Sequence, residues 1–190
     1  SVVCRGIHFR YSIDDPWVLK DVSLTIRPGE MVAIVGPSGV GKSTLLSILA
    51  GLVAPTAGVL EVDGCDVKAC HLPLLRRQIG TVLQQDTLLS GTVLENITLG
   101  EVADIPRVWQ CLAAAGLDNF ASSQPMALAT QVGDEGRLLS GGQQKRLLLA
   151  RALYRAPRVL VLDETLSQLD YEAEQQIMSV LLGLQMTRII

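Results

Sequence analysis

The sequence is short of aromatic residues, which make up only 4% of its 190 residues, so aliphatic side chains must build its core. Positive charge is not in excess either. The formal net charge is −3, which gives no electrostatic footprint for nucleic acid. No apolar run approaches the length of a membrane span, and the opening residues SVVCRGIHFRY lack the long apolar centre of a signal peptide. The chain is long and apolar enough for one well-buried domain with room for a subdomain.

Cysteine is also sparse, and its spacing forms no known pattern. Cys4, Cys65, Cys70 and Cys111 show neither a CxxC pair nor a metal-binding spacing with histidine. We therefore expect all four to be buried, reduced thiols, as is usual in the cytosol.

The most informative stretch is residues 36–44, which read GPSGVGKST and match the pattern G-x-x-x-x-G-K-[ST]. An apolar run at residues 31–35 precedes it, and an apolar periodic segment at residues 45–49 follows it. We expect a buried strand, a loop and a helix, which is the context that a phosphate-binding loop requires. A glycine-rich turn would match the pattern by chance in roughly one chain per hundred of this length, and the flanks lower that frequency further.

The residue types of this loop explain its chemistry. Glycine allows backbone amides to turn inward around a phosphate without a Cβ in the way. Lys42 supplies a mobile charge for the β- and γ-phosphates, and the Ser43 hydroxyl is a ligand for Mg²⁺. The loop thus predicts nucleotide binding by nine consecutive residues: Gly36, Pro37, Ser38, Gly39, Val40, Gly41, Lys42, Ser43 and Thr44.

A second constellation, VLVLDE at residues 159–164, is a short apolar run that ends in two carboxylates. The carboxyl end of a buried parallel strand points into the ligand crevice of an open α/β sheet. Asp163 is then placed to hold Mg²⁺, and Glu164 to polarise a water for attack on the γ-phosphate. The alternative is a strand that ends in two solvated acids, and the phosphate-binding loop favours the first interpretation.

Residue periodicity predicts an α/β fold with a parallel core sheet, an antiparallel edge near the N-terminus and a block of helices from about residue 92 to residue 154. Asp104 with Pro106 marks the start of one helix, and Gly51 and Gly116 mark helix ends. We expect the last residues to begin an unpartnered terminal strand. The strands are expected at residues 2–9, 22–26, 31–35, 59–62, 79–83, 159–162 and 186–190.

Leu139, Ser140, Gly141, Gly142 and Gln143 spell LSGGQ, and here the chain resembles the ATP-binding-cassette (ABC) ATPases. The order of phosphate loop, LSGGQ signature and Asp-Glu strand is that of the family, and the resemblance covers essentially the whole chain. It implies a P-loop NTPase of RecA-like fold. It also implies a single ABC ATPase domain over residues 1–190, in which a helical subdomain at 87–155 is inserted into a core formed by 1–86 and 156–190.

The resemblance also implies roles for single residues. Tyr11 corresponds to an aromatic residue that stacks on adenine, an interaction worth about 1–3 kcal/mol; a half-buried strand residue is the alternative. Gln84, with Gln85 as its competitor, resembles the glutamine that touches Mg²⁺ and the attacking water and senses the transport partner. Ser140 and Gly142 are expected to meet the γ-phosphate bound to a second cassette, with the dipole of the following helix adding to the contact.

One more segment, Ser167, Gln168, Leu169 and Asp170, resembles the D-loop that crosses the interface between two cassettes. Asp170 is also suited to cap a helix, and the two roles are compatible. The implied catalytic residues are therefore Glu164, Gln84 and Lys42, and the implied magnesium ligands are Ser43, Gln84 and Asp163.

Residues 88–100, LLSGTVLENITLG, resemble those of exporters. The sequence around the signature is most similar to that of bacterial peptide and bacteriocin exporters of type I secretion systems. The resemblance implies that Mg·ATP hydrolysis powers export of a peptide or protein. It implies a transmembrane domain of the same transporter, a second cassette in a head-to-tail dimer, and a place at the cytoplasmic face of the bacterial inner membrane, with no nucleic acid partner. The alternatives are a soluble cassette ATPase acting on DNA or ribosomes, and a nucleotide-binding regulatory module without turnover.

The end of the sequence departs from the family pattern. Residues 187–190 resemble the segment that leads into the γ-phosphate-contacting histidine of the family, and the sequence stops before that histidine. We therefore expect the 190 residues alone to bind ATP and to hydrolyse it poorly.

Overall fold

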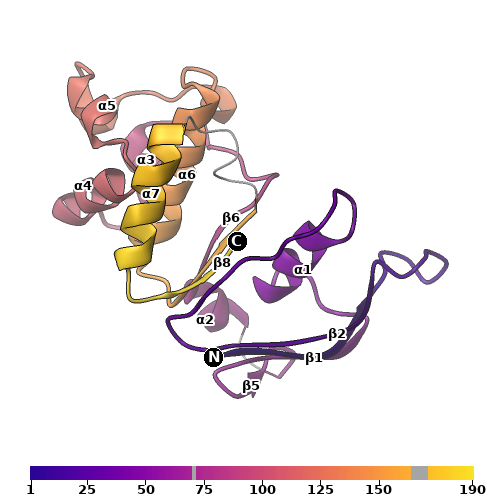
Figure 1. Ribbon diagram of the computed structural model, residues 1–190. Helices are drawn as coiled ribbons and strands as arrows, with labels where there is room; N and C mark the ends of the chain where they lie inside the picture. The colour runs from indigo at the N-terminus through magenta and orange to yellow at the C-terminus, as the bar shows by residue number, and fades with distance from the viewer. Residues whose placement is uncertain (70–71, 164–170) are drawn as a thin grey trace. The chain divides into compact units, whose positions relative to one another are not determined.

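The computed structural model describes residues 1–69, 72–163 and 171–190 (Figure 1). The chain divides into two compact units. Unit 1 comprises Ser1–Thr81, Arg158–Asp163 and Gln185–Ile190, and unit 2 comprises Val82–Pro157 and Glu164–Leu184. The subdomain boundaries that we inferred from the sequence stay a prediction.

An antiparallel sheet with the strand order β2-β1-β4-β5 forms the first part of unit 1. β1 pairs with both β2 and β4, and its buried side chains alternate as Val2 and Cys4 and, after a register shift, as Ile7 and Phe9. This alternation is what a half-buried strand requires. β2 begins three residues before the predicted start, because Leu19 pairs with Phe9. The strands are β1 (Val2–Phe9), β2 (Leu19–Ile26), β4 (Ala57–Val62) and β5 (Cys65–Asp66).

The second sheet has the order β3-β8-β7-β6, and β8 pairs in parallel with both β3 and β7. The prediction of an unpartnered terminal strand is therefore wrong. The carboxyl-terminal segment lies inside the sheet, because its backbone forms hydrogen bonds with β3 on one side and with β7 on the other. The strands are β3 (Met31–Val32), β6 (Ile79–Val82), β7 (Val159–Leu162) and β8 (Thr187–Ile189).

The predicted buried strand at residues 31–35 is wrong in its length and burial. β3 spans only Met31–Val32, which are half-buried, and Val35 is 87% exposed. The chain stays beside β8 as far as Ile34, whose N–H donates to the Ile190 carbonyl at 2.6 Å, and then turns into the glycine-rich loop. The strand ends early because the turn at residues 36–41 takes the backbone away from the ladder.

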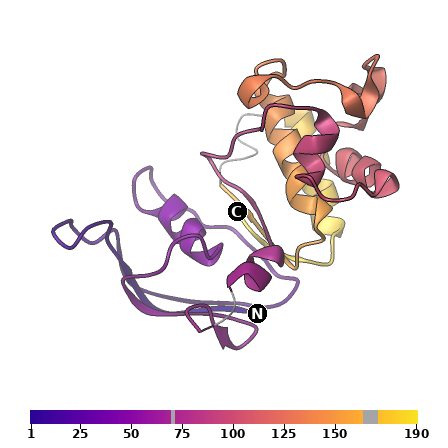
Figure 2. The same ribbon diagram turned by 180° about the vertical axis from the view of Figure 1, so that it is seen from behind.

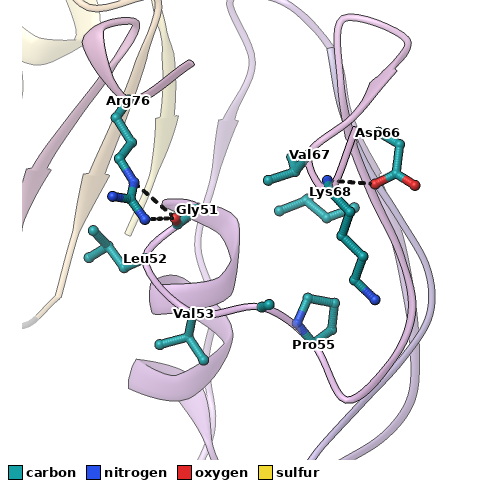
Figure 3. Close-up of a pocket in the computed structure, with 10 residues that line it drawn as sticks. Gly51, Leu52, Val53, Pro55, Asp66, Val67, Lys68 and Arg76 are labelled. Atoms are coloured by element: carbon teal, nitrogen blue, oxygen red, sulfur yellow. Dashed lines mark hydrogen bonds between the residues drawn. The ribbon is translucent and has the colours of Figure 1, made fainter. Parts of the chain in front are cut away.

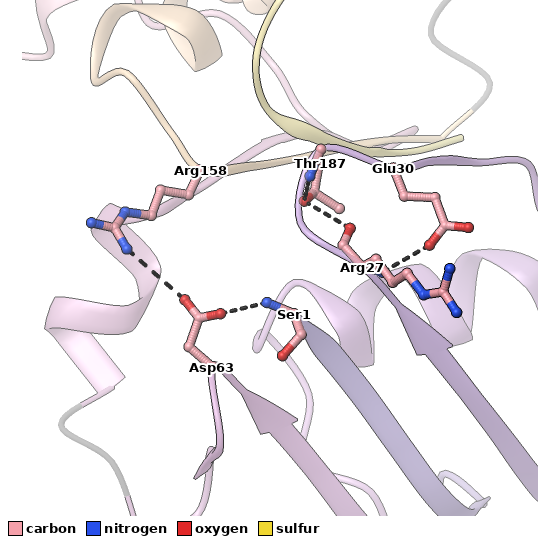
Figure 4. A network of polar contacts seen from close by, with 7 residues as sticks. Ser1, Arg27, Glu30, Asp63, Arg158 and Thr187 are labelled. Atoms are coloured by element: carbon pink, nitrogen blue, oxygen red, sulfur yellow. Dashed lines mark hydrogen bonds and ion pairs between the residues drawn. The ribbon is translucent and has the colours of Figure 1, made fainter.

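A network of polar contacts fastens β8 to the turn between β2 and β3 (Figure 4). The Thr187 hydroxyl accepts from the Gly29 N–H at 3.0 Å and lies 3.4 Å from the Arg27 carbonyl. The Arg27 N–H in turn donates to the Glu30 carboxylate at 2.7 Å. Figure 4 also shows Asp63 between the Ser1 amino group and Arg158, whose guanidinium is 4.0 Å away. The buried Thr187 hydroxyl of β8 thus keeps hydrogen-bond partners within unit 1.

The described residues of unit 1 also form two helices, α1 (Lys42–Leu49) and α2 (Leu72–Arg77). α1 buries an apolar face and contacts β7. It ends as predicted, with Gly51 in the left-handed region at φ 67°, where glycine has no Cβ penalty. The Arg76 guanidinium donates to the Gly51 carbonyl at 3.1 and 3.3 Å, which satisfies one acceptor at the end of α1.

The described part of unit 2 is mainly helical, and α3 and α4 lie beside α6 (Figures 1 and 2). Leu147 and Leu149 of α6 are almost fully buried. The predicted start and end of α4 are confirmed, because Asp104 caps its first turn and Gly116 adopts a left-handed φ of 64° after its last. The helices are α3 (Val93–Thr98), α4 (Ile105–Ala114), α5 (Asp118–Ser123), α6 (Gly141–Tyr154) and α7 (Tyr171–Gly183), with short 3-10 turns at Ala127–Ala129 and Asp134–Gly136.

The cysteines follow the prediction only in part. Cys4 and Cys111 are buried free thiols, and burial raises the pKa of Cys4 to about 11 and also raises that of Cys111. Cys65, by contrast, is exposed and disulfide-bonded, so the prediction of a buried reduced thiol is wrong for it. Cys70 lies outside the described residues.

None of the helices in the described ranges has the length and apolar character needed to cross a membrane.

Gly58 generates a testable prediction about the antiparallel sheet. It has a φ of 89°, and a Cβ there would lie 2.3 Å from the Gly6 carbonyl oxygen of the neighbouring strand. Gly58→Ala should therefore lower the free energy of unfolding by about 3 kcal/mol or more, because the backbone of β1 must move. Gly64 is the matched control, since it has a φ of 79° with nothing within 4 Å. Gly64→Ala should cost only about 1 kcal/mol of left-handed strain. Urea titration of both variants measures the difference, and equal losses would contradict the close approach at Gly58.

Candidate nucleotide-binding site

The phosphate loop leaves β3 and enters α1 through two left-handed glycines. Gly39 and Gly41 have φ values of 77° and 99°. A Cβ on Gly41 would lie 3.0 Å from the Val18 side chain and 3.3 Å from its carbonyl oxygen, so the loop packs closely on the start of β2. No side chain caps the first turn of α1, and that turn contains no acidic residue. Its amides and its dipole therefore face the loop without a competing anion, which suits a phosphate.

Lys42 spans the loop. Its ammonium group donates to the Gly36 carbonyl at 2.9 Å and to the Pro37 carbonyl at 3.1 Å. Both acceptors belong to the exposed loop itself, and the ammonium forms no salt bridge with the carboxylates of residues 1–69, 72–163 and 171–190. The lysine charge is held over the loop, in reach of an anion that the loop encloses.

Tyr11, which the resemblance assigns to the base, lies beside α1. Its hydroxyl is 2.9 Å from the Thr44 hydroxyl, although the two residues are 33 positions apart in the sequence. The Phe9 ring contacts the Tyr11 ring edge to face, with centroids 5.0 Å apart. Tyr11 is nevertheless 71% exposed, so its ring face is available for stacking. The half-buried strand residue that was the alternative is not observed.

Asp163 follows β7 directly and is buried, with 4% exposure. It belongs to unit 1, as do Ser43 and Lys42. The Ser43 hydroxyl, in the exposed first turn of α1, and the Asp163 carboxylate are the hard oxygen donors that Mg²⁺ prefers, and β7 contacts α1. The donor set therefore fits a magnesium ion that keeps several waters. The described residues contain no separate cluster of three or more His, Cys, Asp or Glu side chains suited to a metal.

Gln84 and its competitor Gln85 are exposed and form the tip of a turn in unit 2. The Asp86 N–H donates to the Leu83 carbonyl at 3.0 Å, and the Leu83 N–H donates to the Asp86 carboxylate at 2.8 Å. The two bonds close the turn and leave both glutamine side chains accessible.

The signature residues begin α6 in unit 2. Ser140 is the N-cap: its hydroxyl accepts from the Gln143 N–H at 3.2 Å, and the Gln143 side chain accepts from the Ser140 N–H at 2.9 Å. This reciprocal pair is a capping box. Leu139 is buried, whereas Ser140 and Gly141 are exposed. The exposed end of the signature is consequently held rigid by the helix that it starts.

Glu164 and the predicted D-loop, Ser167, Gln168, Leu169 and Asp170, lie outside the described residues. Within unit 1 the structure brings together Tyr11, the phosphate loop and the start of α1.

A cavity of about 180 Å³ lies in unit 1 between the end of α1 and β5 (Figure 3). Leu52, Val53 and Pro55 supply apolar walls, and Arg76 and Lys68 supply polar ones. None of its lining residues was predicted to bind nucleotide, so this cavity is separate from the candidate site.

The sequence analysis did not identify a set of hydrogen bonds that joins α6 to the segment following Gln84. Asn96 is fully buried, and Arg151 of α6 donates to the carbonyls of Asn96 and Thr87 at 2.8 and 3.0 Å. Burial lowers the pKa of the Arg151 guanidinium, and the carboxylate of Asp86 opposes that shift. No local pattern marks these residues, because their partners are 55 and 64 positions away.

A second capping box was a missed local signal. Thr92 and Glu95 spell T-x-x-E before α3, and the Thr92 hydroxyl accepts from the Glu95 N–H at 3.1 Å. The Thr92 backbone N–H and hydroxyl in turn donate to the Glu95 carboxylate, which lowers its pKa. Ser140 and Gln143 have the same spacing, S-x-x-Q, so this local pattern could have revealed both capping boxes in the sequence.

The family model described as ABC transporter matches residues 19–167. The chain belongs to the ABC transporter family. It is 43% identical over 94% of its length to the exotoxin translocation ATP-binding protein PaxB of Pasteurella aerogenes, and covers 25% of that protein. It is 40% identical over 94% of its length to the alpha-hemolysin translocation ATP-binding protein HlyB of Escherichia coli, and covers 25% of it. Identity to the colicin V secretion/processing ATP-binding protein CvaB of Escherichia coli is 36% over the whole chain, which covers 27% of that protein.

The fold comparison agrees. A solved structure of a bacterial Atm1-family ABC exporter with ATP bound superposes with a TM-score of 0.93 and 34% identity, over 99% of this chain and 34% of that one. The α/β ABC ATPase fold, nucleotide binding and the resemblance to exporter ATP-binding proteins are therefore confirmed. The chain spans about a quarter of the length of the curated relatives described above.

The capping box at Ser140 predicts a measurable stability effect in this ABC domain. Ser140→Ala removes the hydroxyl that accepts from Gln143 and should lower the free energy of unfolding by about 1 kcal/mol. Ser140→Thr keeps a hydroxyl at the cap and should lose less. Urea denaturation followed by far-UV circular dichroism compares them, and an alanine variant as stable as the parent would show that the box contributes nothing.

Proposed function

We propose that this chain is the ATP-binding and ATP-hydrolysing cassette of a bacterial exporter of peptides or proteins. It acts at the cytoplasmic face of the inner membrane, attached to the transmembrane domain of the same transporter. It pairs head to tail with a second cassette, with two ATP molecules between them. The relatives named for translocation of exotoxin and hemolysin and for secretion of colicin V support this proposal.

The observation that carries the proposal is the junction of phosphate loop and aromatic side chain in unit 1. The loop offers glycine amides, an uncapped helix start and the Lys42 ammonium, while Tyr11 lies next to Thr44 in the first turn of that helix. One end of this arrangement suits a phosphate chain, and the other suits a flat base. A nucleoside triphosphate has both groups in one molecule.

Each residue has a part in binding. The Tyr11 ring stacks on adenine, and Lys42 leaves its carbonyl partners Gly36 and Pro37 to contact the β- and γ-phosphates. Ser43 and Asp163 would hold Mg²⁺, with Gln84 as a further ligand. When bound, Mg²⁺ neutralises charge on the β- and γ-phosphate oxygens.

Hydrolysis requires a base and a positioned water. Glu164 accepts the proton of the attacking water while the bond between the γ-phosphorus and the bridging oxygen breaks, which releases ADP and phosphate. Gln84 orients that water. Ser140 and Gly142 of the partner cassette contact the γ-phosphate, and residues 167–170 cross the dimer interface as the D-loop.

Binding is tested with two substitutions in the full-length protein. Lys42→Ala removes the charge on the phosphates and should weaken binding of a fluorescent ATP analogue about tenfold or more. Tyr11→Ala should weaken it about 5- to 150-fold, which corresponds to the loss of one stacked base. Tyr11→Phe is the matched control, because it keeps the ring and loses only the bond to Thr44. Its affinity should stay close to that of the parent. Undiminished affinity in Lys42→Ala would rule out this site.

Turnover is tested with Glu164→Gln. The amide is nearly isosteric with the carboxylate yet accepts no proton, so ATP binding should persist while kcat falls by at least about 100-fold. The variant should also accumulate an ATP-bound dimer of cassettes, which size-exclusion chromatography with saturating ATP detects. A rate near that of the parent would assign the base to another residue.

A further inference from the structure

Two side chains of unit 2, one fully buried and one half-buried, bind the segment that follows the turn of Gln84. The first is Asn96 of α3, which is fully buried. Its side-chain carbonyl accepts from the Leu89 N–H at 2.9 Å, and its amide donates to the carbonyls of Leu89 and Thr92 at 2.9 and 3.0 Å. The backbone that follows the turn is thereby fixed on α3, with the side chain of Asn96 fully hydrogen-bonded.

The second side chain is Arg151 of α6. Its Nε donates to the Asn96 carbonyl at 2.8 Å, one Nη to the Thr87 carbonyl at 3.0 Å, and the other Nη to the side-chain oxygen of Asn96. One acceptor, Thr87, directly follows the turn, and the other two belong to Asn96, which binds the backbone of Leu89. The Asp86 carboxylate, which closes the turn, adds attraction for the guanidinium.

This arrangement requires arginine. A guanidinium presents several donors in a rigid planar fork, whereas a lysine ammonium is a point charge on a flexible stem. A lysine at position 151 keeps the charge but cannot reach all three acceptors at once. The Asn96 side-chain oxygen would keep the Leu89 N–H, but the guanidinium bonds to the Asn96 and Thr87 backbone carbonyls would not both be kept, next to the fully buried Asn96 side chain.

We propose that Arg151 is a positioning residue for Gln84: it holds residues 86–89 so that the turn presents Gln84 in one geometry. Because Arg151 belongs to the helix that starts at Ser140, the same guanidinium links the Gln84 turn to the signature. The inference rests on the proposed function, since it matters only if Gln84 acts on bound ATP. A misplacement of about 1 Å in a catalytic group is enough to lower a rate by about 100-fold.

The decisive variant is Arg151→Lys in the full-length protein, assayed for steady-state ATP hydrolysis. We expect kcat to fall by about 10- to 100-fold, because Gln84 loses its fixed position. KM for ATP and the affinity for a fluorescent ATP analogue should stay within about threefold, because the phosphate loop itself is unaltered. A parental kcat in folded Arg151→Lys would overturn the inference.

Arg107→Lys is the matched control. Arg107 also binds backbone carbonyls of α6, those of Tyr154 and Leu153, but at the opposite end of the helix from Ser140. It should lower stability without a selective loss of kcat. If it reduces kcat as much as Arg151→Lys does, the effect is one of general stability and the inference fails.

A double-mutant cycle with Gln84→Ala shows whether Arg151 acts through Gln84. In the Gln84→Ala background, Arg151→Lys should lower kcat further by less than about threefold. If Gln84→Ala alone lowers kcat and the losses in kcat of the two single variants multiply in the double variant, the inference is overturned. The proposed function would still stand. A Gln84→Ala variant with parental kcat would overturn the proposed role of Gln84, and the inference with it.

Asp86→Ala provides a second test of the inference if the Arg151→Lys variant does not fold. Asp86 is half-buried, so its substitution is milder, and it removes both the closure of the turn and the charge facing Arg151. The same selective loss of kcat, absent in the Gln84→Ala background, supports the inference. Unchanged kcat overturns it.

Discussion

Unit 1 depends on one close approach, that of Gly41 to the start of β2. The backbone at Gly41 is left-handed, and the Val18 side chain lies 3.0 Å from the place that a Cβ would occupy. Only glycine meets both conditions without strain. The approach lets the first turn of α1 lie beside the segment that follows β1, so that the Thr44 hydroxyl reaches the Tyr11 hydroxyl. The phosphate loop and the aromatic side chain that we propose for the base consequently come from segments that are distant in sequence and adjacent in space.

Unit 2 depends instead on α6, which is joined to neighbouring segments by side-chain to backbone hydrogen bonds. Arg107 of α4 meets its carboxyl end, and Gln144 donates to the carbonyls of Gly136 and Leu139 just before its start. Arg151, between these ends, holds the segment behind Gln84. Functional loops are usually mobile, and this helix provides the rigid support that a positioned side chain requires.

Local signals predicted a large part of this fold. The phosphate loop, the caps at Asp104 and Gly116 and the apolar strand before Asp163 all follow from residues within one or two turns of each other. The predicted bounds of β2 and β3 were wrong, and the cause is physical. Strand ends are set by the partner strand, as when Leu19 pairs with Phe9, and a single-sequence pattern contains no information about that partner.

The sequence by itself determined the chemistry: which residues form the phosphate loop, where the signature starts a helix, and which family the motifs resemble. Each depends on side-chain type at short spacing, and short spacing is visible in a string of letters. Only the tertiary structure decided that β8 lies between β3 and β7, that the Tyr11 hydroxyl reaches Thr44, and that Arg151 holds the turn of Gln84. These contacts join residues from 28 to 157 positions apart, and their geometry arises from packing of whole elements, which no local pattern encodes.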